Sequence, residues 1–148
     1  MKKETFTVAL IFTVLLSIGL GVRLGVESNM ETVKTLEGDV TIGVLSDTHI
    51  PTRASGIPEK LLQDFRQRDV DVIIHAGDLV SSEVKEQLEK IAPVVAVCGN
   101  MDPEELCEQL PEKAVVKVDG KRIGVVHNTV NPLSDRMRLL AEENELDV

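Results

Sequence analysis

Cysteine and positive charge are both scarce in this chain, and each shortage excludes a class of protein. The two cysteines, Cys98 and Cys107, are too few for a disulfide framework and lack the C-x-x-C spacing of a metal site, so we interpret them as reduced, small apolar residues. The net charge of −9 repels phosphate backbones, which argues against non-specific nucleic-acid binding unless a bound cation reverses the local field. The chain has no internal repeat, and 148 residues suffice for one domain with a hydrophobic core.

The N-terminus differs in composition from the rest of the chain. Residues 6–22 carry no charge, two lysines precede them, and Arg23 follows them. This run is close to the minimum length for a membrane span, and no clear cleavage site follows it. We therefore expect residues 1–29 to form one hydrophobic helix, an anchor or signal-like segment that associates the protein with a membrane and leaves the main domain outside the cytoplasm. The alternative is translation from Met30, which would give a cytoplasmic protein.

Short apolar runs alternate with amphipathic ones after a polar segment, residues 30–39, which we interpret as a linker. This alternation over residues 40–148 predicts one α/β domain whose mostly parallel sheet is covered by helices. The last two apolar runs are joined through Asp119-Gly120, which predicts a hairpin instead. The expected strands are Val40–Leu45, Val70–Ile74, Val94–Val97, Ala114–Val118 and Ile123–Val126, and the expected helices are Pro58–Arg68, Ser82–Ile91, Pro103–Gln109 and Pro132–Glu143.

Polar side chains that can bind metal ions stand at the ends of four expected strands. Because ligands collect at the carboxyl edge of a parallel sheet, we expect these side chains to share one site. The first two are separated by one residue, so they point to the same side of the chain. In chain order the candidates are Asp47, His49, Asp78, Asn100 and His127.

The motifs around these residues resemble a known family. "DTH", "GD" at Gly77-Asp78, "GN" at Gly99-Asn100 and a histidine after an apolar strand are similar to the calcineurin-like metallophosphoesterase superfamily. Within it, "GVLSDTHIPTRA", "DVIIHAGDL", "VVAVCGNMD" and "KRIGVVH" resemble the small single-domain phosphodiesterase branch. The resemblance implies a four-layer α/β/β/α sandwich around two metal ions. It implies that Asp47, His49 and Asp78 bind one ion and that Asn100 and His127 bind the second. Asp78 would bridge the two ions. The resemblance also implies catalytic roles for Asp78 and Asn100.

The chemistry of these side chains is consistent with such a centre. A mixed set of carboxylate, imidazole and amide ligands favours transition metals over calcium. We expect manganese, with nickel, iron and zinc as alternatives. One carboxylate can bridge two ions that lie roughly 3.5 to 4 Å apart, which suits Asp78. Two cations would attract a phosphate ester to an otherwise acidic protein and would activate a water for in-line attack.

Three further residues have roles outside the metal shells. His75 lies inside an apolar strand, and we expect it to pack there or to orient a ligand. Asp102 precedes Pro103, so capping of the following helix is the favoured role, in support of the site and not as a ligand. Arg53 is a candidate for contact with the substrate phosphate, although an exposed loop arginine is the simpler interpretation.

The chain departs from the superfamily pattern at three places. It ends before the G-H-x-H motif whose two histidines complete the metal shells, so we expect an incomplete, C-terminally truncated copy of the sandwich. The usual H-G-H is His127-Asn128-Thr129. Met101 occupies the position of a histidine that protonates the leaving group in many relatives, which favours small, activated phosphodiesters as substrates.

Two other functions compete with hydrolysis. One is a catalytically silent protein-interaction module on the same fold, as in the retromer subunit that resembles this branch. The other is a nuclease, which is less favoured because the acidic chain has no basic track.

Overall fold

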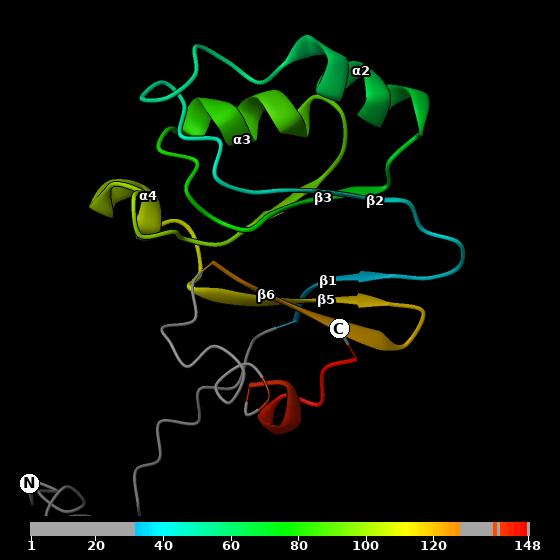
Figure 1. The fold of residues 1–148 in the computed structure, drawn as a ribbon. Helices are drawn as coiled ribbons and strands as arrows, with labels where there is room; N and C mark the ends of the chain where they lie inside the picture. Colours follow the sequence, from blue (N-terminus) through cyan, green and yellow to red (C-terminus); the bar gives the residue numbers. More distant parts are fainter. Residues whose placement is uncertain (1–31, 128–137, 139, 148) are drawn as a thin grey trace, which may run out of the picture.

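Two three-stranded sheets pack face to face, and two helices cover the outer face of one of them (Figure 1). The computed structural model describes residues 32–127, 138 and 140–147. The helices are α2 (Glu59–Gln67), α3 (Ser82–Glu89) and α4 (Glu104–Cys107). The first sheet, in the order β2-β3-β4, contains Ile42–Leu45, Val72–His75 and Val94–Ala96, and the second, in the order β1-β5-β6, contains Thr32–Leu36, Lys113–Val118 and Lys121–Val126.

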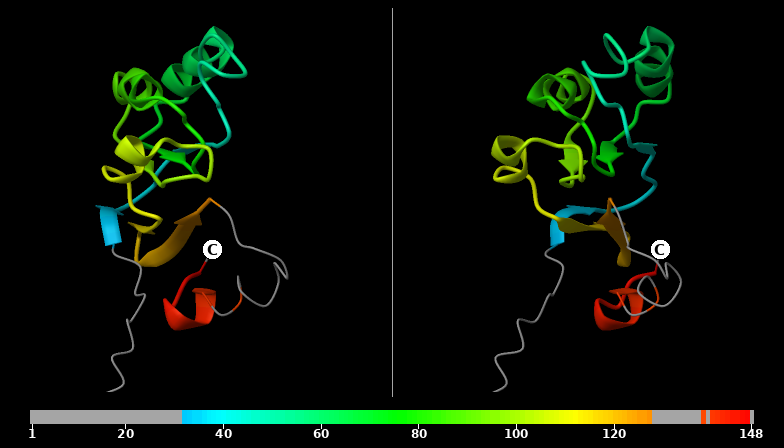
Figure 2. Two further views of the ribbon diagram at one scale, coloured as in Figure 1. Left: turned by 90° about the vertical axis from the view of Figure 1, so that its left-hand side faces the viewer. Right: turned by 60° about the vertical axis from the view of Figure 1, so that its left-hand side comes forward.

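The layers follow the α/β/β/α order that was expected. Helices α2 and α3 lie on one side of the first sheet, the second sheet lies on its other side, and the C-terminal residues 140–147 lie beyond the second sheet (Figure 2). Leu146 packs against Gly124 of β6, where a side chain on the glycine would collide with it. Of the expected helix Pro132–Glu143, residues 138 and 140–143 are helical, and residues 132–137 and 139 lie outside the described residues.

The first sheet is parallel throughout, as its apolar runs predicted. Strand β2 pairs with β3, and β3 pairs with β4, both in parallel register. Leu62 and Phe65 of α2 and Leu88 of α3 fill the layer between helices and sheet. Val72 and Ile74 of β3 face the other way and pack between the sheets. Because β3 is covered on both faces, its sequence is continuously apolar up to His75.

The predicted hairpin is also present. Strands β5 and β6 pair in antiparallel register, from Lys113 opposite Val126 to Val118 opposite Lys121. Asp119 and Gly120 form the turn between them, and both have positive φ, as this short turn requires.

The interpretation of residues 30–39 as a linker is wrong for Thr32–Leu36. These residues form β1, which pairs in parallel with β5. The segment is mostly exposed, and its two threonines and one lysine leave no apolar run that would indicate a strand. Its β-branched residues suit a strand, and Leu36 packs into the layer between the sheets.

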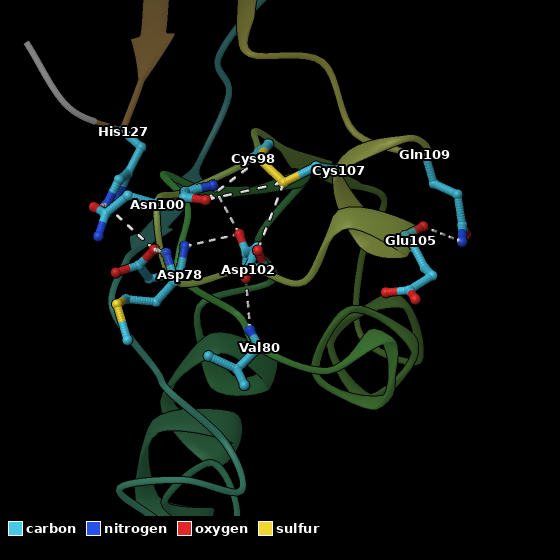
Figure 3. Close-up of a disulfide and its surroundings, with 11 residues drawn as sticks. Asp78, Val80, Cys98, Asn100, Asp102, Glu105, Cys107, Gln109 and His127 are labelled. Carbon is cyan, nitrogen blue, oxygen red and sulfur yellow. Dashed lines mark hydrogen bonds and ion pairs between the residues drawn. A yellow bond between two sulfur atoms is a disulfide. The ribbon is translucent and has the colours of Figure 1, made fainter.

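The interpretation of the cysteines as reduced is also wrong. Cys98 and Cys107 form a disulfide, with their Cα atoms 5.1 Å apart. Cys98 follows β4, and Cys107 ends α4, so the bond attaches this short helix to the sheet (Figure 3). The sequence places a turn and a helix between the two cysteines, but only the fold brings them into contact.

No helix within the described residues is long and apolar enough to cross a membrane. The expected N-terminal hydrophobic helix, residues 1–29, lies outside those residues.

Candidate metal centre

The expected ligands meet at the carboxyl edge of the first sheet. The loop after β2 is attached to the loop after β3 by backbone hydrogen bonds from the N–H of Asp47 to Gly77 O and from the N–H of His49 to Asp78 O, both 3.0 Å. Asn100 follows β4, and His127 follows β6 of the second sheet. The site therefore lies where the two sheets meet at one end.

Asp78 lies at the centre of this group. Its Oδ2 is 3.5 Å from His49 Nε2, and its Oδ1 is 3.3 Å from His127 Nε2. Its side chain is only 3% exposed, whereas Asp47, whose Oδ1 is 3.7 Å from His49 Nε2, is 55% exposed. Each oxygen of the Asp78 carboxylate thus faces a different imidazole, and the site opens to solvent on the Asp47 side.

The ring of His127 is oriented by a backbone carbonyl. Its Nδ1 is 2.7 Å from Ala76 O, and a carbonyl can only accept a hydrogen bond, so Nδ1 carries a proton. In the neutral imidazole the lone pair is then on Nε2, which lies 3.0 Å from Asn100 Oδ1 (Figure 3). The hydrogen bond from Nδ1 to a backbone carbonyl is typical of histidines that bind a metal ion through Nε2.

Two glycines allow these side chains to come close together. A Cβ on Gly77 would be 2.6 Å from the ring of His127, and a Cβ on Gly99 would collide with Asp78 Oδ1. Because real atoms do not approach so closely, either position excludes a side chain unless the site moves. The "GD" and "GN" motifs therefore have a steric reason for their glycine.

Several residues of the site have left-handed backbone conformations. The φ angles are 55° at Asp47, 46° at His49, 59° at Asp78 and 73° at Val80. This region costs energy for residues other than glycine, and most for a β-branched one such as Val80. The surrounding hydrogen bonds hold this strained backbone in place.

The donor set fits a divalent metal ion. Ligand atoms of Asp47, Asp78 and His127 all lie within 4.8 Å of one another. The carboxylate oxygens of Asp47 and Asp78 and Nε2 of His127 converge on one place, and these are ligand types that a divalent transition-metal ion binds. The structure thus unites the five predicted ligands, and His49 and Asn100 flank this cluster.

His75 occupies the position predicted for it. Its side chain is fully buried, and its Nε2 is 3.1 Å from Oγ1 of Thr48, the residue between the predicted ligands Asp47 and His49. Its Nδ1 has no hydrogen-bond partner among the described residues. Burial lowers the pKa of His75 from 6.5 to about 4, so the ring is neutral at physiological pH.

Arg53 and Met101 lie at the rim. Arg53 is exposed, and its backbone N–H donates to His49 O at 2.7 Å. Met101 is 54% exposed, and its backbone N–H donates to Asp78 Oδ1 at 2.8 Å. The thioether of Met101 has no proton to give a leaving group.

The predicted helix cap at Asp102 is wrong. Helix α4 has Pro103 at its N-cap and no hydrogen bond from a capping side chain. The carboxylate of Asp102 accepts instead from backbone N–H groups of the loops after β3 and β4. The prediction failed because the position of Asp102 before Pro103 suggests a cap locally. Its actual partners, the N–H groups of Asp78 and Val80, are more than twenty residues away in the sequence.

Other supporting groups were not predicted. The carbonyl of Ala76, the hydroxyl of Thr48 and the Cys98–Cys107 disulfide all lie beside the ligands. For Thr48 the sequence offers a signal, since it lies between two ligands. A carbonyl group has no residue-specific signal at all.

Comparison with known proteins assigns the fold and the site to one family. The pattern of the calcineurin-like phosphoesterase superfamily domain matches residues 40–148. The chain belongs to the calcineurin-like phosphoesterase superfamily. The resemblance predicted from the "DTH", "GD" and "GN" motifs is therefore confirmed.

Two archaeal proteins are similar to this calcineurin-like chain. A probable metallophosphoesterase of Methanothermobacter thermautotrophicus is 46% identical over 98 residues, which cover 66% of this chain and 55% of that protein. A probable metallophosphoesterase of Methanocaldococcus jannaschii is 40% identical over 125 residues, covering 82% of this chain and 62% of that protein. The matched part of the chain thus spans a little over half of the length of each relative.

Solved structures of Vps29 are similar to this calcineurin-like domain. Vps29 of Chaetomium thermophilum has a TM-score of 0.63 and 27% identity, covering 74% of this chain and 56% of that one. Vps29 of Entamoeba histolytica, solved in complex with Zn²⁺, has a TM-score of 0.56 and 28% identity, covering 72% and 59%. A metal ion is therefore found in a protein of similar fold.

Proposed function

We propose that this domain hydrolyses phosphodiesters with the help of two divalent metal ions, preferably manganese. One observation carries the proposal: the two oxygens of the buried Asp78 carboxylate face His49 and His127, at 3.5 and 3.3 Å. A carboxylate between two imidazoles is suited to bridge two ions. We propose that Asp47, His49 and Asp78 bind one ion. Asp78, Asn100 and His127 would bind the other ion.

Divalent ions bound here would supply Lewis acidity and a water of lowered pKa. The residues of the chain fix the geometry. Ala76 O holds His127 so that its Nε2 lone pair faces the site, and Asn100 offers an amide oxygen beside it. The exposed Arg53 lies four residues after His49, where its guanidinium can contact a substrate phosphate.

The proposed preference for activated diesters comes from the rim of the site. Met101, next to Asn100, cannot donate a proton, so a leaving group that needs none is favoured. The net charge of −9 disfavours long nucleic acids, and a small phosphodiester is the proposed substrate.

The test is Mn²⁺-dependent release of nitrophenol from bis-p-nitrophenyl phosphate, since nitrophenolate leaves without protonation. We expect slow turnover, abolished by Asp47→Asn, and a higher rate when a downstream G-H-x-H segment is added. The Asp71→Asn variant is the matched control, because its carboxylate lies at the other end of the sheet, where it accepts from Thr41 N at 2.8 Å.

Two results would contradict these expectations in different ways. Rapid turnover by the chain without the added segment would show that the six predicted ligand contacts suffice. No turnover with or without that segment would favour the second candidate function, a catalytically silent interaction module. That candidate is supported by the similarity to Vps29 and by the exposed, apolar side chains of Val44 and Met101.

We also propose that residues 6–22 anchor the domain to a membrane and that the domain lies outside the cytoplasm. The Cys98–Cys107 disulfide supports this location, because disulfides persist in oxidising compartments. The full chain is expected in the membrane fraction and a chain starting at Met30 in the supernatant. Recovery of the intact full chain from the supernatant would refute the anchor.

A further inference from the structure

The carboxylate of Asp102 connects two loops that carry proposed metal ligands. Its Oδ2 accepts from the N–H of Asp78 at 3.0 Å and from the N–H of Gly99 at 2.7 Å. Its Oδ1 accepts from the N–H of Val80 at 2.6 Å. Figure 3 shows the side chain lying between the Asp78 loop and the disulfide. One side chain thus binds three backbone donors from the ends of two neighbouring strands.

Two of these donors belong to residues with left-handed backbone. Asp78 has φ 59° and Val80 has φ 73°. A β-branched residue rarely adopts this region, so something must compensate for its cost. Hydrogen bonds to an ionised carboxylate are about twice as strong as those between neutral groups. Asp102 therefore stabilises the conformation in which the Asp78 loop is strained.

That conformation sets the position of the ligands. The backbone of Asp78 directs its carboxylate toward His49 and His127. Gly99, the third donor, immediately precedes Asn100, whose Oδ1 is 3.0 Å from His127 Nε2. A displacement of one loop relative to the other would separate Asp78 from Asn100.

We propose that Asp102 is a positioning residue that holds the 78–80 and 99–100 loops together so that Asp78 and Asn100 bind the same metal ion. The proposal rests on the metal centre proposed above. Asp102 itself is held between Cys98 and Cys107, whose disulfide closes the loop that contains it. Because that covalent bond remains after substitution, loss of the Asp102 carboxylate changes the spacing of the loops without releasing α4.

The test compares Asp102→Asn with wild type and with Asp71→Asn. Asparagine keeps the shape of the side chain, but only one of its two terminal atoms accepts a hydrogen bond, so at least one backbone donor loses its partner. Mn²⁺ titration calorimetry should show binding of the ion at Asn100 weakened roughly 10- to 100-fold, the range for residues that orient ligands. The electron paramagnetic resonance spectrum should lose the signal of a coupled pair of Mn²⁺ ions and keep that of a single ion. Asp71→Asn should resemble wild type in both.

A second variant tests the route through the backbone. Val80→Gly removes the cost of φ 73°, since glycine adopts this region readily. If Asp102 acts by holding this strained loop, Val80→Gly should restore part of the Mn²⁺ affinity and of the coupled spectrum in the Asp102→Asn background. It should have a smaller effect in the wild-type background.

The outcomes separate this inference from the proposed function. A coupled pair of Mn²⁺ ions in both wild type and Asp102→Asn, at equal affinity, would overturn the role of Asp102 and leave the metal centre intact. Absence of Mn²⁺ binding in wild type would overturn the metal centre and this inference with it. Failure of both Asp102→Asn and the double variant to fold would also overturn it, because Asp102 would then maintain the whole domain and not the spacing of two loops.

Discussion

His127 Nε2 lies 3.3 Å from Asp78 Oδ1, although the two residues follow strands of different sheets. The ring is fixed from behind by the carbonyl of Ala76, two residues before Asp78. The position of the second sheet against the first therefore determines whether the proposed metal ligands meet.

Asp78 is expected to be essential for metal binding. The variant Asp78→Asn keeps the volume of the side chain but removes the charge between His49 and His127. We expect Mn²⁺ affinity to fall at least about 10-fold and any Mn²⁺-dependent diesterase rate to fall about 100-fold. Metal content after dialysis and nitrophenol release measure the two effects. Equal metal content in Asp78→Asn and wild type would exclude Asp78 as a bridge.

The glycine of the "GN" motif is expected to be intolerant of a side chain. In Gly99→Ala the new methyl would collide with Asp78 Oδ1, so the carboxylate must move. We expect Mn²⁺ affinity to fall about 10-fold or more, together with a lower melting temperature. Gly56→Ala is the matched control, because a Cβ there has no neighbour within 4 Å. Similar Mn²⁺ titrations for the two variants would show that the close packing at Gly99 does not position Asp78.

Reduction of the disulfide is expected to destabilise the domain. The Cys98–Cys107 bond spans nine residues in sequence, and closing a loop of this length stabilises a fold by roughly 3 kcal/mol. Denaturant unfolding with and without dithiothreitol measures the difference. The variant Cys98→Ser/Cys107→Ser contains no other cysteine, so its unfolding should not respond to the reductant. An identical response in wild type would show that the bond is absent in solution.

Stability is expected to fall in acid through His75. Burial lowers the pKa of this histidine from 6.5 to about 4, so between these pH values the unfolded chain binds a proton that the native chain does not. The free energy of unfolding therefore decreases as the pH is lowered from 6.5 to 4, by roughly 3 kcal/mol from this group. Unfolding is measured in EDTA, with His75→Gln as the reference that does not titrate. An equal loss in both proteins over this range would contradict the assignment.

Much of the first sheet and of the ligand set follows from local sequence. Runs such as Val72–His75 are apolar because both of their faces are buried, and polar residues begin where such a strand leaves the core. In a parallel sheet these points share one edge, so the order of motifs was enough to predict that Asp47, Asp78 and Asn100 lie near each other.

Two of the features that were predicted wrongly depend on contacts between distant segments. Thr32–Leu36 is a strand only because β5 lies beside it, with more than eighty residues between partners. Asp102 has the local pattern of a helix cap, yet its carboxylate binds the N–H groups of Asp78 and Val80.

The sequence by itself determined the alternation of strands and helices, the Asp119-Gly120 hairpin and the residue types of the proposed metal centre. These depend on periodicity and turn chemistry, which act over a few residues. The tertiary structure alone decided the pairing of β1, the bond between Cys98 and Cys107, and the strained backbone held by Asp102. Each of these depends on how the two sheets and the short helix α4 pack together. That packing decides which strand edges pair, which sulfur atoms meet and which backbone N–H groups reach the Asp102 carboxylate.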